Sequence, residues 1–410
     1  MYAPSNQPRP APARPRRALW PAAAAPLAAA CGLALSHCAG ESDPPNPIPI
    51  VGSVRPQPTT MPPSDPPATA AKPVVIGHRG ASALRPEHTL ASYRKAIEDG
   101  ADVIEPDLVL TKDGVLVARH ENDITGTTNV AEVDEFAARK TTKTIDGAAI
   151  EGWFTEDFTL DELKRLRARE RIPSVRPDNQ RYTDESIPTL AEVVALAKTM
   201  SAETGRTIGL YPETKHPSYF KSINLPFEAK LIDLLRADEF TAKTTTVYIQ
   251  SFEVWNLKEL RGAIGASQPN WKLVQLIDDA AKAPYDFVAA GDARTYADLL
   301  TEAGIKEIAT YADGIGPYKL NLIKVDAAGA FQPPSDVIRL AHASKLVVHS
   351  WTFRPENSFL PAPLKAPGAD SVRNPSGSVT EIQAYLKAGL DGVFTDDPAV
   401  GRQAVDTFKP

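Results

Sequence analysis

Cysteine is nearly absent from this chain of 410 residues, which has only Cys31 and Cys38, both close to the N-terminus. The body of the protein therefore has no disulfide and no thiolate ligand for a metal ion. This absence excludes a structural zinc site of the finger type. Any metal in the folded body must be bound by oxygen or imidazole ligands.

A surplus of positive charge is also missing. The chain has 45 Lys and Arg residues against 51 Asp and Glu, which gives a net charge of -6 and a pI near 5.8. Because proteins that bind nucleic acid present a basic face, no nucleic-acid partner is expected. The content of 42% hydrophobic and 23% charged residues is typical of a soluble globular protein. An anionic substrate would therefore be bound by a local positive charge or a metal ion.

Long hydrophobic runs are missing as well. The most apolar stretch, within residues 14–40, is interrupted by Pro21 and Pro26 and is too short for a confident spanning helix. Its basic start, Ala/Leu-rich centre and small residues are typical of a secretory signal peptide, which we assign to residues 1–38. The alternative is an unstructured Pro/Ala-rich leader in the cytoplasm.

The end of this leader resembles a bacterial lipobox, in which a lipidated cysteine becomes the new N-terminus. The sequence LSHC ends at Cys38, but His37 stands where that motif has a small residue. Two outcomes remain open: a membrane tether through lipidated Cys38, or cleavage near Ala39. Residues 39–72 carry ten prolines, which predicts an extended linker. We therefore expect an exported protein, either periplasmic, lipid-anchored to the envelope or secreted, with a folded body at 73–410.

The folded body alternates short apolar runs with amphipathic helical patterns. This alternation predicts a parallel sheet covered by helices, and the number of units favours an α/β fold of the TIM type, a closed (β/α)8 barrel. There are nine candidate strands, one more than the barrel needs. They are VVIG (74–77), DVIEPDL (102–108), VLVA (115–118), IGLYPE (208–213), VYIQSF (247–252), LVQLI (273–277), DGIGP (313–317), LVVHSW (346–351) and GVFTD (392–396).

The run at 115–118 follows its neighbour too closely for a crossover helix. Either it pairs antiparallel after a turn at Asp113-Gly114, or the chain returns irregularly. Helix starts are predicted by capping-box patterns at Thr159, Thr189 and Ser378. Helix ends are expected at three glycines, Gly100, Gly304 and Gly389.

Two stretches, 121–158 and 169–187, are longer than ordinary connections and show little periodicity. We interpret residues 121–187 as an insertion on the barrel's upper rim. Either it covers the substrate or it is only a packing embellishment. A shorter rim loop is expected after Glu213.

Acidic residues stand at the ends of two predicted strands. Glu105 and Asp107 are two residues apart, so both side chains leave the same face, and Glu213 and Lys215 repeat this spacing. At the strands' carboxyl ends all of them would point into the barrel mouth. Three carboxylates in one space repel each other unless they are protonated or bridged by a cation. Oxygen ligands favour a hard divalent cation, Ca²⁺ or Mg²⁺.

Histidine is scarce, with 7 residues, yet His78 and His120 both follow predicted strands. Arg79 offers a planar fork suited to phosphate, and Lys215 adds a second positive charge. Together with a cation they would neutralise a phosphoryl group, while two imidazoles move protons. This set suits cleavage of a phosphodiester. Phe252 and Trp351, together with His349, are candidates for the apolar wall of the site.

These motifs, in order along the chain, resemble the glycerophosphodiester phosphodiesterase family of the PLC-like phosphodiesterase superfamily, in particular its exported bacterial members. The resemblance runs from about Val74 to Val400. It rests on HRGAS, PEHT, GADVIEPDLVLTKDG, LVARH, GLYPETK, YIQSF, YADGIGP, LVVHSWTF and GVFTDDP. It implies a TIM-type barrel that hydrolyses deacylated phospholipid diesters, such as glycerophosphocholine and glycerophosphoethanolamine, to glycerol 3-phosphate and an alcohol.

The resemblance also implies roles for individual residues. His78 and His120 match the family's acid/base pair, and a cyclic phosphate formed by the glycerol 2-hydroxyl is the implied intermediate. The implied ligands of one divalent cation, most often Ca²⁺, are Glu105, Asp107 and Glu213. Arg79 and Lys215 match the positive residues around the phosphate. Glu121 stands where the family commonly has aspartate, so the orientation of His120 is the open point.

Two other functions remain as alternatives. The same barrel and metal could cleave a lysophospholipid, a sphingolipid or a sugar phosphodiester, although the rim loops are mostly polar. Alternatively, the protein could be a surface-binding lipoprotein that uses the barrel as a scaffold. A pure binder has no need of the full set of histidines and carboxylates.

Overall fold

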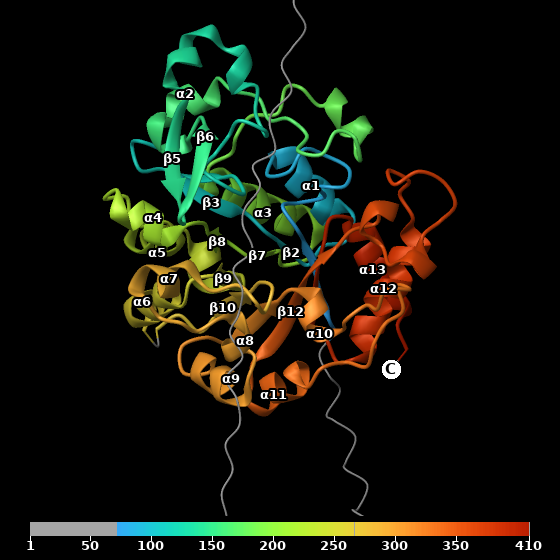
Figure 1. Ribbon diagram of the computed structural model, residues 1–410. Coiled ribbons are helices and arrows are strands. Elements are labelled where there is room, and N and C mark those ends of the chain that lie inside the picture. Colours follow the sequence, from blue (N-terminus) through green and yellow to red (C-terminus); the bar gives the residue numbers. More distant parts are fainter. Residues whose placement is uncertain (1–71, 266, 410) are drawn as a thin grey trace, which may run out of the picture. The chain divides into compact units, whose positions relative to one another are not determined.

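Eight parallel strands close into a barrel in the computed structural model, which describes residues 72–265 and 267–409 (Figure 1). The strands of the ring are, in order, β1 (Val74–Gly77), β2 (Val103–Ile104), β7 (Gly209–Leu210), β9 (Val247–Ser251), β10 (Trp271–Ile277), β11 (Gly314–Pro317), β12 (Val347–Phe353) and β13 (Gly392–Thr395). Pairing of β13 with β1 closes it. The predicted TIM-type barrel is confirmed. The signal peptide, Cys38 and the linker, apart from Lys72, lie outside the described residues.

Every predicted strand run contains a strand, and two runs are divided by a proline. The run at 102–108 yields β2 and β3 (Asp107–Leu110), and the run at 208–213 yields β7 and β8 (Glu213–Thr214). Proline has no N–H to donate to the sheet. The carbonyl oxygen of Pro106 still accepts the N–H of Glu213 at 3.0 Å, so the two extensions stay side by side.

The surplus run forms β4 (Leu116–Ala118), which pairs antiparallel with β3. Of the two alternatives for this run, the antiparallel strand is therefore confirmed. It adds a short hairpin to the ring, with the chain reversing at Asp113-Gly114, where Gly114 has a φ of 76°. This hairpin carries the chain from β3 to His120.

The hydrophobic core has an inner and an outer part. Inside the barrel, the buried residues Ile76, Val103, Val274 and Phe394 pack around Tyr211. A larger cluster fills the space between the strands and the surrounding helices. Each fully buried aliphatic or aromatic side chain contributes roughly 1.5–3 kcal/mol relative to exposure. The ring is therefore a rigid base for the residues that follow its strands.

Helices cover the outside of the barrel in the part of the chain described (Figure 1). They are α1 (Leu90–Glu98), α2 (Leu160–Lys164), α3 (Leu190–Thr204), α4 (Pro217–Ser222), α5 (Glu228–Ala237), α6 (Val254–Ile264), α7 (Tyr285–Ala290), α8 (Tyr296–Leu299), α9 (Glu302–Ile308), α10 (Lys319–Leu322), α11 (Val337–Ala343), α12 (Pro375–Lys387) and α13 (Pro398–Thr407). None of the helices within these residues is long and apolar enough to cross a bilayer. The rim loop expected after Glu213 contains α4.

Two of the three predicted helix starts are confirmed. Thr159 and Thr189 form complete capping boxes at α2 and α3. The third is wrong, because Asn374 caps α12 and Ser378 lies inside that helix. Among the glycines, Gly304 was wrongly expected to end a helix: it lies within α9, where a Cβ would come within 2.2 Å of a carbonyl oxygen of α8. Close packing of two helices, rather than chain termination, requires glycine there.

The insertion at residues 121–187 contains more regular structure than the sequence indicated. Residues 141–152 form a hairpin of β5 (Thr141–Ile145) and β6 (Ala148–Gly152), which Figure 1 shows next to α2 on one side of the barrel. The expectation of an aperiodic stretch there is wrong. The turn residues Asp146 and Gly147 both have positive φ, as a two-residue hairpin turn requires.

Candidate active site

One inner cavity at the carboxyl ends of the strands has a volume of about 80 Å³. Nine of the ten residues proposed from the sequence line it: His78, Arg79, Glu105, Asp107, His120, Glu213, Lys215, Phe252 and Trp351. They come from six regions of the chain, and each lies in the strand extensions or turns at this end of the barrel. The barrel geometry therefore brings them together as predicted.

Three buried carboxylates form the centre of the site. Oxygen atoms of Glu105, Asp107 and Glu213 lie within 4.8 Å of one another. Glu105 accepts the N–H of Arg79 at 3.0 Å and the side-chain amide of Gln250 at 2.8 Å. The Oδ1 atom of Asp107 is buried without a hydrogen-bond partner. A buried carboxylate oxygen without a donor, with two further carboxylates within reach, is what a hard divalent cation needs, so these residues fit the ion that the sequence predicts.

The electrostatics of the three carboxylates support this fit. Burial, followed by repulsion from Asp107 and Glu213, raises the pKa of Glu105 well above its usual range. Burial also raises the pKa of Glu213 to about 8, against the opposing effect of Lys215. For Asp107, Lys215 and His88 outweigh burial and hold the pKa well below its usual range. A divalent cation would stabilise the ionised form of all three.

Arg79 and Lys215 place two positive charges beside the carboxylates. Lys215 lies 2.7 Å from Glu213 and 3.8 Å from Asp107. The guanidinium of Arg79 donates to Glu87 at 3.0 Å, and its Nε lies 3.6 Å from Asp107 without a hydrogen-bond partner. Arg79 has a φ of 57°, a backbone conformation that residues other than glycine seldom adopt. Its N–H bond to Glu105 fixes that conformation.

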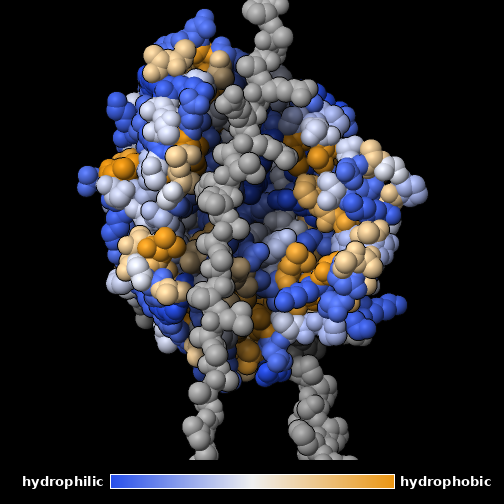
Figure 2. Space-filling view, in the orientation of Figure 1, coloured by the Kyte–Doolittle hydropathy of each residue, from blue (hydrophilic) through white to orange (hydrophobic). Residues whose placement is uncertain are grey.

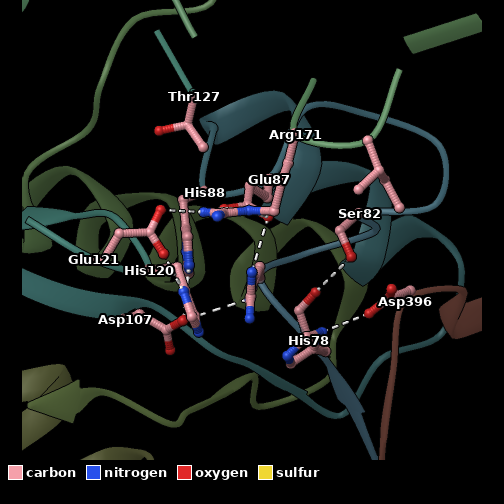
Figure 3. A network of polar contacts seen from close by, with 12 residues as sticks. His78, Ser82, Glu87, His88, Asp107, His120, Glu121, Thr127, Arg171 and Asp396 are labelled. Carbon is pink, nitrogen blue, oxygen red and sulfur yellow. Dashed lines mark hydrogen bonds and ion pairs between the residues drawn. The ribbon is translucent and has the colours of Figure 1, made fainter. Parts of the chain in front are cut away.

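His78 follows β1 directly and is held through one ring nitrogen. Its Nδ1 is 2.5 Å from Asp396, the residue that follows β13 (Figure 3). Its Nε2 is 3.9 Å from Glu105. Ser82 donates its hydroxyl to the carbonyl of His78 at 3.0 Å. Burial lowers the pKa of His78 to about 4, although Asp396 opposes this shift. With Nδ1 paired to Asp396, Nε2 is the nitrogen that faces the cavity.

His120 follows β4 and has a carboxylate partner of the same kind. Its Nδ1 lies 2.5 Å from Glu121 (Figure 3). The glutamate that departs from the resembled family's aspartate thus contacts the ring of its neighbour. Burial, then the charges of Arg79 and Lys215, lower the pKa of His120 well below its usual range. The side chain is 32% exposed, compared with 9% for His78.

A second, outer cavity of about 560 Å³ opens next to the inner one. His120, Glu213, Lys215, Phe252 and Trp351 line both cavities, whereas His78 lines only the inner one. Figure 2 shows a hollow at the centre of this face, with hydrophilic surface in its depth. The rings of Phe252 and Trp351 meet edge to face, with their centroids 5.7 Å apart, and give both spaces an apolar wall. Both aromatic residues therefore lie where the sequence placed them.

His349 does not line either cavity, which corrects its assignment as a wall of the site. It points into the barrel interior, where its Nδ1 is 2.9 Å from the hydroxyl of Tyr211. Residues 349 and 351 share one face of β12, but Trp351 is at the cavity end of the strand while His349 lies deeper. Alternation alone could not distinguish the two depths.

Several functional neighbours were missed by the sequence reasoning. Asp396 and Gln250 stand in strand-end motifs, so their position alone could have indicated them. Glu87 lies in the first loop and contacts Arg79. Arg171 and Arg176 contact the site from the insertion, in a stretch whose sequence carries no periodic signal. Their partners are 50 and 220 residues away in the chain.

The barrel and its site define a class of protein, a phosphoric diester hydrolase. The sequence profile described as the glycerophosphoryl diester phosphodiesterase family matches residues 78–400, and the chain belongs to this family. The protein is thus a glycerophosphodiester phosphodiesterase, as the strand-end motifs implied.

Individual relatives agree with this assignment. A glycerophosphodiester phosphodiesterase of Arabidopsis thaliana is 32% identical over 344 residues, which cover 80% of this chain and 85% of the relative. The enzyme of Haemophilus influenzae is 27% identical over 359 residues, 82% of this chain and 90% of the relative. Among solved structures, an Oleispira antarctica phosphodiesterase in complex with the product sn-glycerol-3-phosphate superposes with a TM-score of 0.52 at 20% identity. The match covers 82% of this chain and 98% of that structure.

Proposed function

We propose that the protein hydrolyses small glycerophosphodiesters, such as glycerophosphocholine and glycerophosphoethanolamine, to sn-glycerol 3-phosphate and an alcohol. The observation that carries this proposal is the paired arrangement of His78 and His120. Each has its Nδ1 on a carboxylate. Both line a cavity that is also lined by the three carboxylates and by the positively charged side chains of Arg79 and Lys215. Sn-glycerol 3-phosphate is the product named for the Oleispira structure.

The cation is proposed to be Ca²⁺, with Mg²⁺ as the alternative, bound by Glu105, Asp107 and Glu213. When bound, it would supply positive charge to the phosphoryl oxygens and lower the barrier to attack at phosphorus. Arg79 and Lys215 add two further charges on the protein side. Together they would orient the phosphate in the inner cavity.

The two histidines are given separate roles by their positions. His78 lines only the inner cavity, so its Nε2 would take the proton from the glycerol 2-hydroxyl, whose oxygen then attacks phosphorus. His120 also lines the outer cavity, where the head group leaves, so its Nε2 would give a proton to the departing alkoxide. The anionic phosphate beside His120 favours the protonated form that this step requires.

The second half of the reaction reverses these roles. The first step leaves a cyclic phosphate that joins the 2- and 3-oxygens of glycerol. His120 would take a proton from water, whose oxygen attacks phosphorus, and His78 would return its proton to the 2-oxygen. The bond from phosphorus to that oxygen breaks, which gives glycerol 3-phosphate and restores both histidines.

The residues that line the outer cavity are suited to binding a small cationic head group. Glu253 lines it and is buried, and its carboxylate accepts hydrogen bonds from Ser218 rather than from a cation. Burial raises the pKa of Glu253 to about 8. A positive charge bound nearby would lower that pKa again and would be stabilised by the ionised carboxylate. The rings of Phe252, Tyr296 and Trp351 also line the cavity and offer faces for a quaternary ammonium group.

Comparison of head groups tests this assignment. Glycerophosphocholine should be cleaved with a lower KM than glycerophosphoglycerol, whose head group is neutral. Glu253→Gln should raise the KM for the choline substrate by up to about fivefold and leave the neutral substrate unchanged, since an ion pair open to solvent contributes about 0.2–1 kcal/mol. Faster cleavage of a lysophospholipid would instead favour the second candidate. Binding of glycerophosphocholine without turnover would favour the surface-binding scaffold.

Export is proposed on the sequence of residues 1–72 alone. The basic, Ala/Leu-rich leader and the proline-rich linker support an envelope or secreted location for the barrel at 73–410. Mass spectrometry of the mature protein tests it. A lipidated Cys38, or an N-terminus near Ala39, would support export, and an intact Met1 in the cytoplasm would contradict it.

A further inference from the structure

The rim segment, residues 169–187, is the last part of the insertion and reaches the mouth of the barrel. It contains a short turn of helix at Pro177–Arg181 and ends before α3. Two of its arginines, Arg171 and Arg176, turn toward the site instead of solvent. Their side chains are 30% and 7% exposed. Each reaches a carboxylate that is already bound to one of the two histidines.

Arg171 contacts the carboxylate that holds His120. Its Nη2 donates to one oxygen of Glu121 at 2.6 Å, and the other oxygen of Glu121 is on the His120 ring (Figure 3). The same guanidinium donates to Glu87 at 2.6 and 3.0 Å. Glu121 is therefore fixed from two sides and cannot rotate away from the imidazole without losing a charge-assisted bond.

Arg176 makes the equivalent contact on the other side of the site. Its Nη2 donates to one oxygen of Asp396 at 2.5 Å, while the other oxygen of Asp396 pairs with His78. Arg176 also donates to Glu356 at 2.6 Å and to the carbonyl of Ser82 at 2.9 Å. Its guanidinium is thus held in place by two further residues, Glu356 and Ser82, besides Asp396.

We propose that Arg171 and Arg176 are positioning residues, which fix the Glu121 and Asp396 carboxylates and through them the rings of His120 and His78. This inference rests on the acid/base roles proposed above. A carboxylate held by arginine keeps the proton on Nδ1 of the imidazole, which leaves Nε2 aimed at the substrate. The rim segment thereby supports both proton transfers, although it contributes no group that touches the reacting atoms.

A purely structural brace would make the same contacts, so the test must separate the two roles. Leaving-group dependence does so, because 4-nitrophenolate departs without protonation whereas choline does not. Loss of His120 positioning should slow the first step only for the substrate whose leaving group needs its acid. The later hydrolysis of the cyclic phosphate needs His120 with both substrates, so release of 4-nitrophenolate in the first turnover is the discriminating measurement. General destabilisation, or a loss of phosphate binding through Glu87 and Arg79, would affect both substrates alike.

The experiment uses the full chain with Ca²⁺ and two substrates, glycerophosphocholine and the 4-nitrophenyl ester of glycerol phosphate. The variants are Arg171→Gln, Glu121→Gln, the double variant and Arg171→Lys. Arg181→Gln is the matched control, because Arg181 lies in the same segment but is exposed and contacts only Tyr182. Circular dichroism and the thermal unfolding midpoint establish that each variant is folded.

For Arg171→Gln we expect kcat on glycerophosphocholine to fall about 10- to 100-fold, the range seen when a residue that orients a catalytic histidine is lost. KM should change less than twofold, and the rate of 4-nitrophenolate release in the first turnover, which precedes hydrolysis of the cyclic phosphate, should fall less than threefold. Glu121→Gln should show the same pattern. The kcat of the double variant on glycerophosphocholine should lie within about twofold of the kcat of the less active single variant. Arg171→Lys should recover part of kcat, and Arg181→Gln should match the unmodified protein.

Three results would overturn the proposal. Arg171→Gln could retain full kcat, it could slow the first-turnover release of 4-nitrophenolate as much as it slows glycerophosphocholine cleavage, or its loss could multiply with that of Glu121→Gln. Arg176→Gln gives a second reading: kcat should fall on both substrates, because His78 acts before the leaving group departs, while KM and the unfolding midpoint stay unchanged. Full activity, or a loss that comes with a raised KM or a lowered midpoint, would contradict its role. If the unmodified protein cleaves neither substrate, the proposed function fails instead, and the two failures are thereby distinguished.

Discussion

At the scale of single residues, His78 and His120 have similar partners but different surroundings. Both rings contact a carboxylate through Nδ1, but only His120 is accessible from the outer cavity. This asymmetry, rather than the identity of the residues, supports the proposal that His78 is the base and His120 the acid. It also makes the assignment testable by the choice of leaving group.

Replacing each histidine by alanine should give different results on two substrates. His78→Ala should lower kcat roughly 10²- to 10⁴-fold on both glycerophosphocholine and the nitrophenyl ester, because both need the base. His120→Ala should show such a loss on glycerophosphocholine, whereas release of 4-nitrophenolate in the first turnover should change little, because only the later hydrolysis step needs His120 there. Steady-state kinetics with glycerophosphocholine and single-turnover kinetics with the nitrophenyl ester check this. Equal losses for both variants on both substrates would contradict the division of roles.

The residues of the inner cavity could be predicted because the sequence places them at strand ends. A barrel brings all such ends to one mouth, so Glu105, Glu213 and Trp351 meet although they are far apart in the chain. The arginines at 171 and 176 could not be found in this way. They lie in a segment without periodicity, and their contacts depend on how that segment folds over the rim.

At the scale of elements, the turn after β1 positions both His78 and Arg79. Gly80 has a φ of 92°, and a Cβ at this position would come within 2.6 Å of the backbone of Ser92 in α1. The loop and the helix therefore touch at a point where only hydrogen fits. This contact fixes the direction in which the two preceding side chains leave the strand.

Gly80→Ala should therefore disturb both stability and activity. We expect a loss of unfolding free energy above the roughly 1–3 kcal/mol that a strained backbone conformation costs by itself, together with lower kcat. Gly205→Ala is the control, since Gly205 also has positive φ, at the end of α3, but has open space around it. Urea unfolding of both variants measures the difference. Equal destabilisation would show that the contact with Ser92 has no influence.

Elements with local signals were predicted well, and those decided by tertiary contacts were not. The capping boxes at Thr159 and Thr189 are complete within four residues, so the sequence contains all their partners. Ser378 has the same pattern, but Asn374 and the following proline start α12 one turn earlier. The hairpin β5–β6 was missed although its Asp146-Gly147 turn is a recognisable signal, because its strands are largely exposed and lack an apolar alternation.

At the scale of the whole molecule, the barrel contains all the residues of the site. The ring closes between β1 and β13, so the strand that starts at Val74 is required for folding. We propose that the segment before it serves export and tethering and has no part in catalysis.

Removal of residues 1–71 tests that division. The shortened chain should unfold at the same temperature as the full chain, within about 2 °C, and should keep kcat and KM on glycerophosphocholine, because Lys72 and the whole barrel remain. A change of 1 kcal/mol would shift the midpoint by about 2–4 °C or less in a domain of this size. A large loss of stability would show that the leader or linker packs on the barrel.

The most direct test of the central claim is the release of glycerol 3-phosphate from glycerophosphocholine by EDTA-treated protein, with and without added Ca²⁺. We predict no release without a metal ion and restored release with Ca²⁺, whereas Glu213→Gln, which loses one charged ligand, should need more Ca²⁺ or stay inactive. Full activity after EDTA treatment would contradict a metal site at Glu105, Asp107 and Glu213. Absence of activity with Ca²⁺, Mg²⁺ or Mn²⁺ in folded protein would contradict the proposed substrate.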